Sequence, residues 1–137
     1  MKKALLIAII LSIILLSACS NGKPQRLEEF YQDAKIENVD KVIIQDGTTG
    51  GSIEILKKEQ VDEFLSLIKD ITFTPQSNQA NVKGWRYGIT LFDNEKEFQF
   101  TLSQIGDTYY DSTPDIFPIV DDYYKSLKMK DGNTTKK

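Results

Sequence analysis

The longest stretch of helical spacing lies near the middle of the chain. Apolar residues recur there every three or four positions, at Val61, Phe64, Leu65, Ile68 and Ile71. Acidic residues gather near the start of the stretch and Lys69 lies near its end, an arrangement that suits the helix dipole. The pattern predicts a helix over residues 57 to 71 with one buried face.

Two pairs of strands are predicted on either side of that helix. The first pair is residues 42 to 44 and 53 to 55, separated by the glycine-rich segment 45 to 51. The second pair is residues 85 to 91 and 98 to 102, in which apolar and polar residues alternate around a polar turn at 93 to 96. A further short strand is expected at residues 108 to 112, after a turn at 105 to 107.

A closing helix is expected after Thr113-Pro114-Asp115, because these residue types are typical of helix starts. Its apolar face would be formed by Ile116, Ile119, Val120, Tyr123 and Leu127. The expected order is β-β-α-β-β-β-α, which predicts an α+β fold. In that fold an antiparallel sheet of about five strands carries both helices on one face.

The first twenty residues follow another pattern. Met1-Lys2-Lys3 is a positive start, and the following run, Ala4 to Leu16, has 13 residues of which only Ser12 is polar. The run is shorter than the ~20 apolar residues that a membrane-spanning helix needs, and it is typical of a secretory signal peptide. It ends in Leu16-Ser17-Ala18-Cys19, which resembles the lipobox of bacterial lipoproteins at all four positions.

The resemblance implies that prolipoprotein diacylglyceryl transferase attaches lipid to Cys19 and that signal peptidase II then cuts between Ala18 and Cys19. The mature protein would be held by its lipid at the extracytoplasmic face of the cell membrane. Because the chain has one cysteine, lipidation would leave no thiol for a disulfide, a zinc site or redox chemistry. We therefore expect a signal peptide at 1 to 18, a lipidated tether at 19 to 35, a domain at 36 to 128 and a disordered tail at 129 to 137. Residues 24 to 35 of the tether could form a short helix or stay a coil, and the sequence does not decide between the two.

The chain has 137 residues, which is enough for one small domain, and its composition excludes several classes of function. The absence of histidine excludes histidine-based nucleophile activation and histidine metal ligation. Of 17 basic and 20 acidic residues, cleavage would remove Lys2 and Lys3, so that 15 and 20 remain and the net charge is −5. An acidic protein is a poor partner for nucleic acid or anionic lipid, so membrane contact is expected through the lipid on Cys19.

Three segments invite a catalytic or metal-binding interpretation, and each lacks a needed feature. Residues 47 to 52 are glycine-rich, but they lack the Lys-Ser/Thr pair and the following helix of a phosphate-binding loop. Asp121 and Asp122 are adjacent on a predicted helix, where their side chains diverge by about 100°. Residues 93 to 97 lack the ligand spacing of a calcium loop. No catalytic residue, metal or cofactor is therefore expected.

Aromatic residues suggest one candidate surface. Neighbours on a strand point to opposite faces, so Tyr109 or Tyr110 must leave the core. An exposed tyrosine beside Arg86 on the outer sheet face would suit a partner protein, because both residue types are enriched at interfaces. We take Arg86 and Tyr110 as the candidate partner surface.

Two short motifs carry a second resemblance, Asp46-Gly47-Thr48-Thr49-Gly50 and Gly84-Trp85-Arg86-Tyr87. Over residues 40 to 127 the chain is similar to a small domain of unknown function found in secreted proteins and lipoproteins of Firmicutes. That resemblance implies a location and a fold, and no activity. The leading hypothesis is a non-enzymatic, lipid-anchored binding module, including immunity or exclusion roles at the cell surface. The alternative is a small envelope hydrolase or transferase that uses carboxylate and tyrosine side chains.

Overall fold

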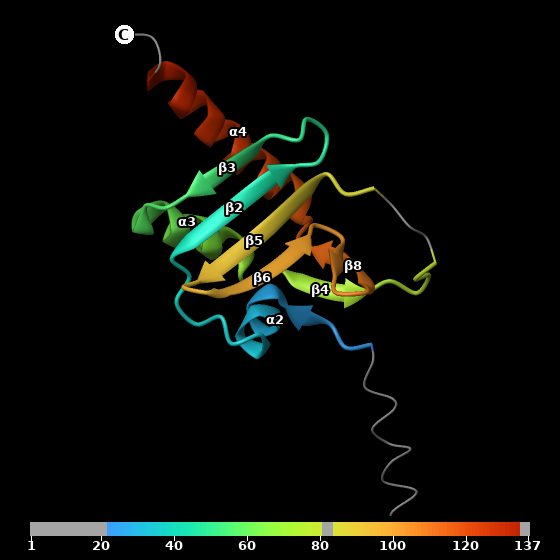
Figure 1. Ribbon diagram of the computed structural model, residues 1–137. Helices are drawn as coiled ribbons and strands as arrows, with labels where there is room; N and C mark the ends of the chain where they lie inside the picture. Colours follow the sequence, from blue (N-terminus) through green and yellow to red (C-terminus); the bar gives the residue numbers. More distant parts are fainter. Residues whose placement is uncertain (1–21, 81–83, 135–137) are drawn as a thin grey trace, which may run out of the picture.

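The computed structural model describes residues 22 to 80 and 84 to 134, which form an α+β fold (Figure 1). Within these residues the helices are α2 (Leu27–Asp33), α3 (Lys58–Ile68) and α4 (Ile116–Thr134). The strands are β1 (Gln25–Arg26), β2 (Lys41–Asp46), β3 (Ser52–Ile55), β4 (Thr72–Pro75), β5 (Tyr87–Asp93), β6 (Lys96–Thr101), β7 (Gln104–Ile105) and β8 (Thr108–Thr113).

The larger sheet is antiparallel and has the strand order β3-β2-β5-β6. Val42 of β2 lies opposite Leu91 of β5, and Ile44 lies opposite Ile89. All four side chains are buried, and the residues between them, Ile43 and Thr90, are only partly buried. This period of two gives the sheet one apolar face, as the alternation in the sequence predicts.

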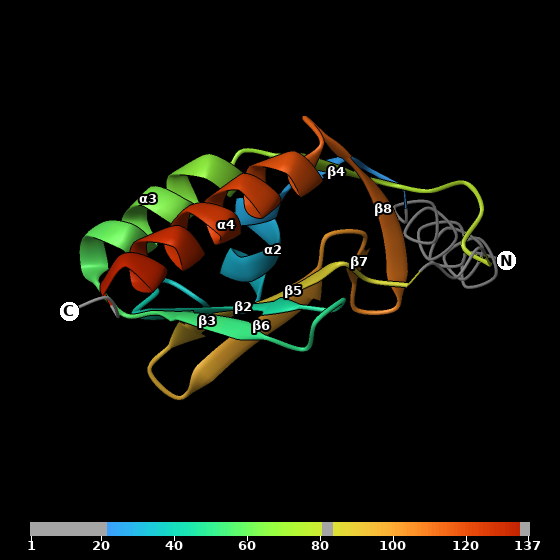
Figure 2. The ribbon, with the colours of Figure 1, turned by 90° about the horizontal axis from the view of Figure 1, so that it is seen from above.

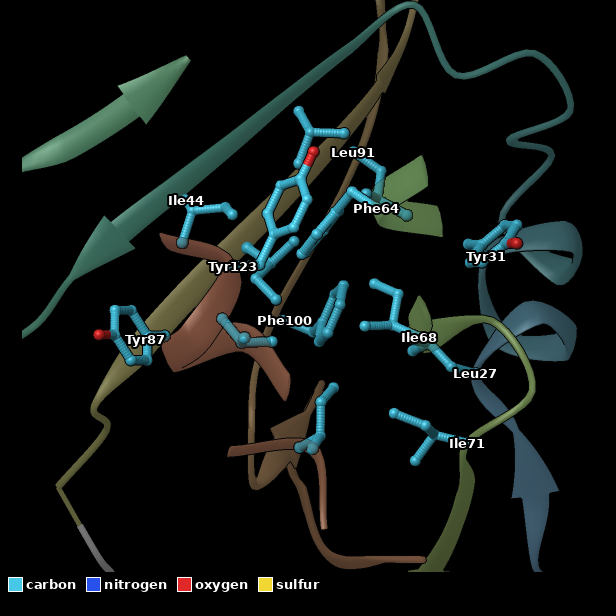
Figure 3. Close-up of a cluster of buried hydrophobic side chains, with 14 of the residues drawn as sticks. Leu27, Tyr31, Ile44, Phe64, Ile68, Ile71, Tyr87, Leu91, Phe100 and Tyr123 are labelled. Atoms are coloured by element: carbon cyan, nitrogen blue, oxygen red, sulfur yellow. The ribbon is translucent and has the colours of Figure 1, made fainter. Parts of the chain in front are cut away.

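Both helices that the sequence predicts cover that apolar face. Figure 2 shows α3 and α4 side by side above the sheet, with α2 on the same side. Val61, Phe64 and Ile68 of α3 are fully buried, which confirms the helical stripe. Side chains from all three helices and from both sheets meet between the layers (Figure 3).

A second antiparallel sheet, of order β1-β4-β8-β7, closes the end of the helical layer (Figure 2). The α+β class and the antiparallel pairing are confirmed, but the expected single sheet of about five strands is two sheets of four, with three helices in the described part of the chain. The prediction missed β4 because Thr-Phe-Thr-Pro has one apolar residue and pairs with β8, which begins 33 residues later. Strands of two residues, such as β1 and β7, are too short to show any periodicity.

The boundaries at both ends also differ from expectation. β1 pairs with β4, and Leu27 and Tyr31 of α2 are buried in the core, so residues 25 to 33 belong to the domain and not to a tether. At the other end α4 continues to Thr134, where a disordered tail from residue 129 was expected. The predicted signal peptide and the lipobox with Cys19 lie outside the described residues. No helix that the structure describes is both long and apolar enough to span a bilayer.

Candidate functional site

The two motifs singled out in the sequence contact each other at one end of the larger sheet. The Gly47 N–H donates a 2.7 Å hydrogen bond to the Arg86 carbonyl oxygen, and the ring of Trp85 lies against Gly47 and Gly88. A Cβ atom at Gly47 would lie 2.5 Å from the Trp85 carbonyl oxygen and 2.7 Å from a ring carbon. Only glycine allows this approach of the two backbones.

Asp46 holds the turn of the β2–β3 hairpin in shape. Its Oδ1 accepts the N–H groups of Thr48 and Thr49, at 2.8 and 3.4 Å, and Gly50 takes the positive φ of 74° that the turn requires. The hydrogen bond from Thr48 lowers the pKa of Asp46 below its usual value, and the positive charge of Arg86 adds to the effect. Asp46 is therefore ionised at neutral pH, and it lies directly opposite Tyr87 in the β2–β5 register.

A buried hydrogen-bond network joins β5 to α4. The Tyr87 hydroxyl donates to Asp121 Oδ1 at 2.6 Å, and Lys125 Nζ donates to Asp121 Oδ2 at 2.6 Å. Tyr87 lies at the edge of the core with its hydroxyl pointing away from the other labelled side chains (Figure 3). The hydrogen bond from Lys125 lowers the pKa of Asp121 most, and the hydrogen bond from Tyr87 lowers it further. The pKa of Tyr87 is raised, mainly by burial and next by its hydrogen bond to Asp121.

Two more cations lie over aromatic rings beside this network. The Arg86 guanidinium lies 5.4 Å from the ring centre of Phe117 and 5.9 Å from that of Tyr87. Lys128 Nζ lies 5.5 Å from the ring centre of Tyr124. Tyr124 is 4% exposed, and its buried hydroxyl has no hydrogen-bond partner in the described structure.

These side chains surround a cleft of about 530 Å³ between α4, the β2–β3 turn and the start of β5. Tyr124, Lys125, Lys128 and Met129 come from α4, and Arg86 and Tyr87 come from the segment that leads into β5. We call it the α4 cleft, and its lining is Asp46, Thr49, Arg86, Tyr87, Tyr124, Lys125, Lys128 and Met129.

The candidate surface of Arg86 and Tyr110 is not brought together by the structure. Arg86 lies in the α4 cleft, on the helix side of the larger sheet. Tyr110 belongs to β8 of the other sheet, and its ring packs edge-on against Phe30 and Phe73, at 5.4 and 6.1 Å between ring centres. The sequence predicts a single sheet, and so it places Arg86 and Tyr110 on one face although they belong to different parts of the fold. The outer face of the larger sheet carries Lys41, which lies over Phe92 and 3.7 Å from Glu54.

Sequence reasoning missed the part of the cleft that α4 contributes. Its signal was present as spacing, because Asp121 and Lys125, and likewise Tyr124 and Lys128, lie four residues apart on a helix. Asp122 is exposed and Asp121 is buried, so these adjacent carboxylates diverge as expected. In residues 22 to 80 and 84 to 134 no three acidic or cysteine side chains are grouped in a way that could hold a metal ion.

Comparison of the chain with protein families, with curated proteins and with solved structures finds no match in any of the three.

Proposed function

We propose that this protein is a lipid-anchored, extracytoplasmic binding protein that captures its partner in the α4 cleft and performs no chemistry on it. The lipobox that ends in Cys19 supports the anchor. The observation that carries the binding role is the α4 cleft itself, where three cationic side chains and the side chains of Tyr87 and Tyr124 line an open volume of about 530 Å³. Pockets that combine aromatic walls with a few convergent polar groups are typical ligand sites.

The position of the cleft supports this role. From Cys19 to Gln25, where β1 begins, the chain advances six residues, which at ~3.3–3.6 Å each span at most about 22 Å. The described chain starts at the lower right of Figure 1, while the β2–β3 turn lies at the top of the molecule. An anchor at Cys19 would thus hold the domain close to the bilayer and leave the α4 cleft at the opposite end.

The hydrolase alternative lacks a suitable acid at this site. General acid catalysis by a carboxyl group needs a raised pKa, so that the proton is present at neutral pH. The pKa values of Asp46 and Asp121 are both lowered, by backbone N–H groups at Asp46 and by Lys125 and Tyr87 at Asp121. Both carboxylates stay ionised and serve as hydrogen-bond acceptors within the protein.

The anchor is tested by replacing Cys19 with alanine. Cys19→Ala should abolish incorporation of labelled palmitate and block cleavage by signal peptidase II, which a gel shift would detect. The fold of the described domain should be unchanged, because it begins beyond Cys19. If the wild-type protein takes up no lipid label, or if Cys19→Ala still does, the anchor is excluded.

The binding role is tested by photo-crosslinking in living cells. A crosslinking amino acid at Met129, which is 67% exposed at the mouth of the cleft, should capture a partner. The same amino acid at Leu67 of α3, which is 44% exposed outside the cleft lining, is the matched control. Capture at Met129 should be lost when Arg86→Gln and Lys128→Gln are combined. Equal capture at both positions, or capture that survives the double change, would exclude the α4 cleft as the binding site.

A further inference from the structure

We infer that the ligand presents an oxyanion, a phosphate or carboxylate group, to the cationic side chains of the α4 cleft. This inference rests on the proposed binding role, but it does not depend on the lipid anchor. The groups that would bind the oxyanion are the side chains of Arg86, Lys125 and Lys128 and the hydroxyl of Tyr124.

The charge of the cleft has the sign that attracts an anion. The mature chain would carry 15 basic and 20 acidic side chains, yet three cations and one carboxylate line the cleft. That carboxylate, Asp46, already accepts two backbone N–H groups. Even when Asp121, the partner of Lys125, is counted with Asp46, three cations face two carboxylates, so the cleft is locally positive in an acidic protein. Clustered positive charge attracts an anion.

The cationic side chains of the cleft also have hydrogen-bond donors without an acceptor. Within the described residues, the Arg86 side chain and Lys128 Nζ contact aromatic rings, and neither has a carboxylate oxygen within 4.0 Å. Lys125 uses one donor on Asp121, which also fixes the position of its amino group. A guanidinium and two ammonium groups aimed at one volume match the several acceptor atoms of an oxyanion.

The Tyr124 hydroxyl is buried, and among the described residues it has no hydrogen-bond partner. It lies near Gly51, and a Cβ atom at Gly51 would be 3.5 Å from this hydroxyl and 3.6 Å from Lys128 Nζ. Lys128 is exposed and its Nζ lies 5.5 Å from the centre of the Tyr124 ring, so a ligand bound by Lys128 would lie next to this tyrosine. A buried polar group without a partner is costly, and an oxyanion that accepts a hydrogen bond from this hydroxyl would remove that cost.

The test is calorimetric titration of the full chain, as isolated from the expressing cells in a neutral detergent, with inorganic phosphate and with acetate. Sodium chloride of equal ionic strength is the reference, because it screens charge without offering an oxyanion. We expect saturable binding of phosphate or of acetate, and the tighter of the two identifies the group that the site prefers. Binding of neither anion above the chloride reference would overturn the inference.

Single variants then locate the site. Arg86→Gln and Lys128→Gln should each weaken binding about tenfold, the effect of losing one charge-assisted hydrogen bond. Lys57→Gln is the matched control, because Lys57 is exposed outside the cleft lining, and it should bind like the wild type. Tyr124→Phe should weaken binding about threefold or more without lowering resistance to urea, since its hydroxyl has no partner in the ligand-free protein. Affinities that these cleft variants leave unchanged would overturn the inference.

The outcome separates this inference from the proposed function. Crosslinking from Met129 that requires Arg86 and Lys128, together with no binding of either anion, would keep the binding role and exclude an oxyanion ligand. Anion binding that depends on Arg86 and Lys128, with no crosslinking in cells, would support the anion site and exclude capture of a cellular partner there.

Discussion

The hydroxyl group of Tyr87 donates a 2.6 Å hydrogen bond to the buried carboxylate of Asp121, and so connects the first residue of β5 to the second turn of α4. The same carboxylate accepts Lys125 on its other oxygen. One buried acid thereby sets the distance between the sheet and the helix and also fixes one cation of the α4 cleft. Stability and the geometry of the proposed site are coupled through Asp121.

The hydrogen bond between Tyr87 and Asp121 can be measured by removing the hydroxyl. We expect Tyr87→Phe to lower the free energy of unfolding by about 1.5–3 kcal/mol, the range for hydrogen bonds to charged groups. Urea denaturation measures this change. Tyr124→Phe is the matched control, because the Tyr124 hydroxyl has no partner and its removal should cost nothing. Equal losses in the two variants would contradict the role given to Asp121.

Stability should fall in acid because three buried carboxylates have lowered pKa values, and Asp93 is the clearest case. Its Oδ2 accepts the N–H groups of Glu37 and Asn38, at 3.0 and 3.1 Å, which lower the pKa of Asp93 below the ordinary value of 3.8. A folded-state pKa below the unfolded value stabilises the fold above the unfolded pKa, and this stabilisation is lost as pH falls through the folded value.

The measurement is the free energy of unfolding between about pH 6 and pH 2, where these carboxyl groups titrate. The wild type should lose stability as the pH falls below about 4, whereas Asp93→Asn should start lower and decline less steeply. Asp122→Asn, at an exposed position, should keep the wild-type slope. A wild-type slope in Asp93→Asn would show that Asp93 does not carry the effect.

The close approach of Gly47 to Trp85 predicts a large effect from one methyl group. Gly47→Ala would place its Cβ 2.5 Å from the Trp85 carbonyl oxygen, so the backbone must move, at a cost of about 1–3 kcal/mol. Gly84→Ala is the control, since nothing lies within 4 Å of the position of its Cβ. Thermal unfolding of the two variants gives the comparison. A Gly47→Ala protein as stable as Gly84→Ala would contradict the contact.

The inclusion of α2 in the domain is tested at Leu27. Leu27 is fully buried, so Leu27→Ala should lower the free energy of unfolding by about 2–4 kcal/mol. Leu67→Ala removes the same atoms from a side chain that is 44% exposed and should cost much less. Urea denaturation distinguishes these outcomes, since a free tether would make Leu27→Ala silent.

Local patterns were sufficient to predict the parts of the fold that are made by neighbouring residues. Spacing and turn chemistry predict the apolar stripe of α3, both hairpins of the larger sheet and the start of α4. At that start, the Asp115 side chain accepts the Phe117 N–H, as its residue type suggests. The second sheet was not predictable in this way, because β4 joins β1 and β8 across long sequence separations. One strand with a single apolar residue gives no periodic signal.

The candidate site divides in the same way. Arg86 could be selected from the sequence as an exposed cation in a distinctive motif, but its partners lie on α4, about thirty to forty residues later. Its neighbours could be identified only once α4 was packed against the start of β5. The sequence predicts an exposed Tyr110 because nothing in it signals the two-residue pairing of β1 with β4. That pairing brings α2 and its Phe30 beside Tyr110 of β8.

The docking of β1 onto β4 has a mechanical consequence. If the chain is held at Cys19, any pull on the domain enters the fold at β1, which is two residues long and pairs with one strand. Leu27 and Tyr31, buried directly behind β1, then resist the load. Under tension the β1–β4 pairing would therefore be loaded first, and release of α2 would remove two residues from the core.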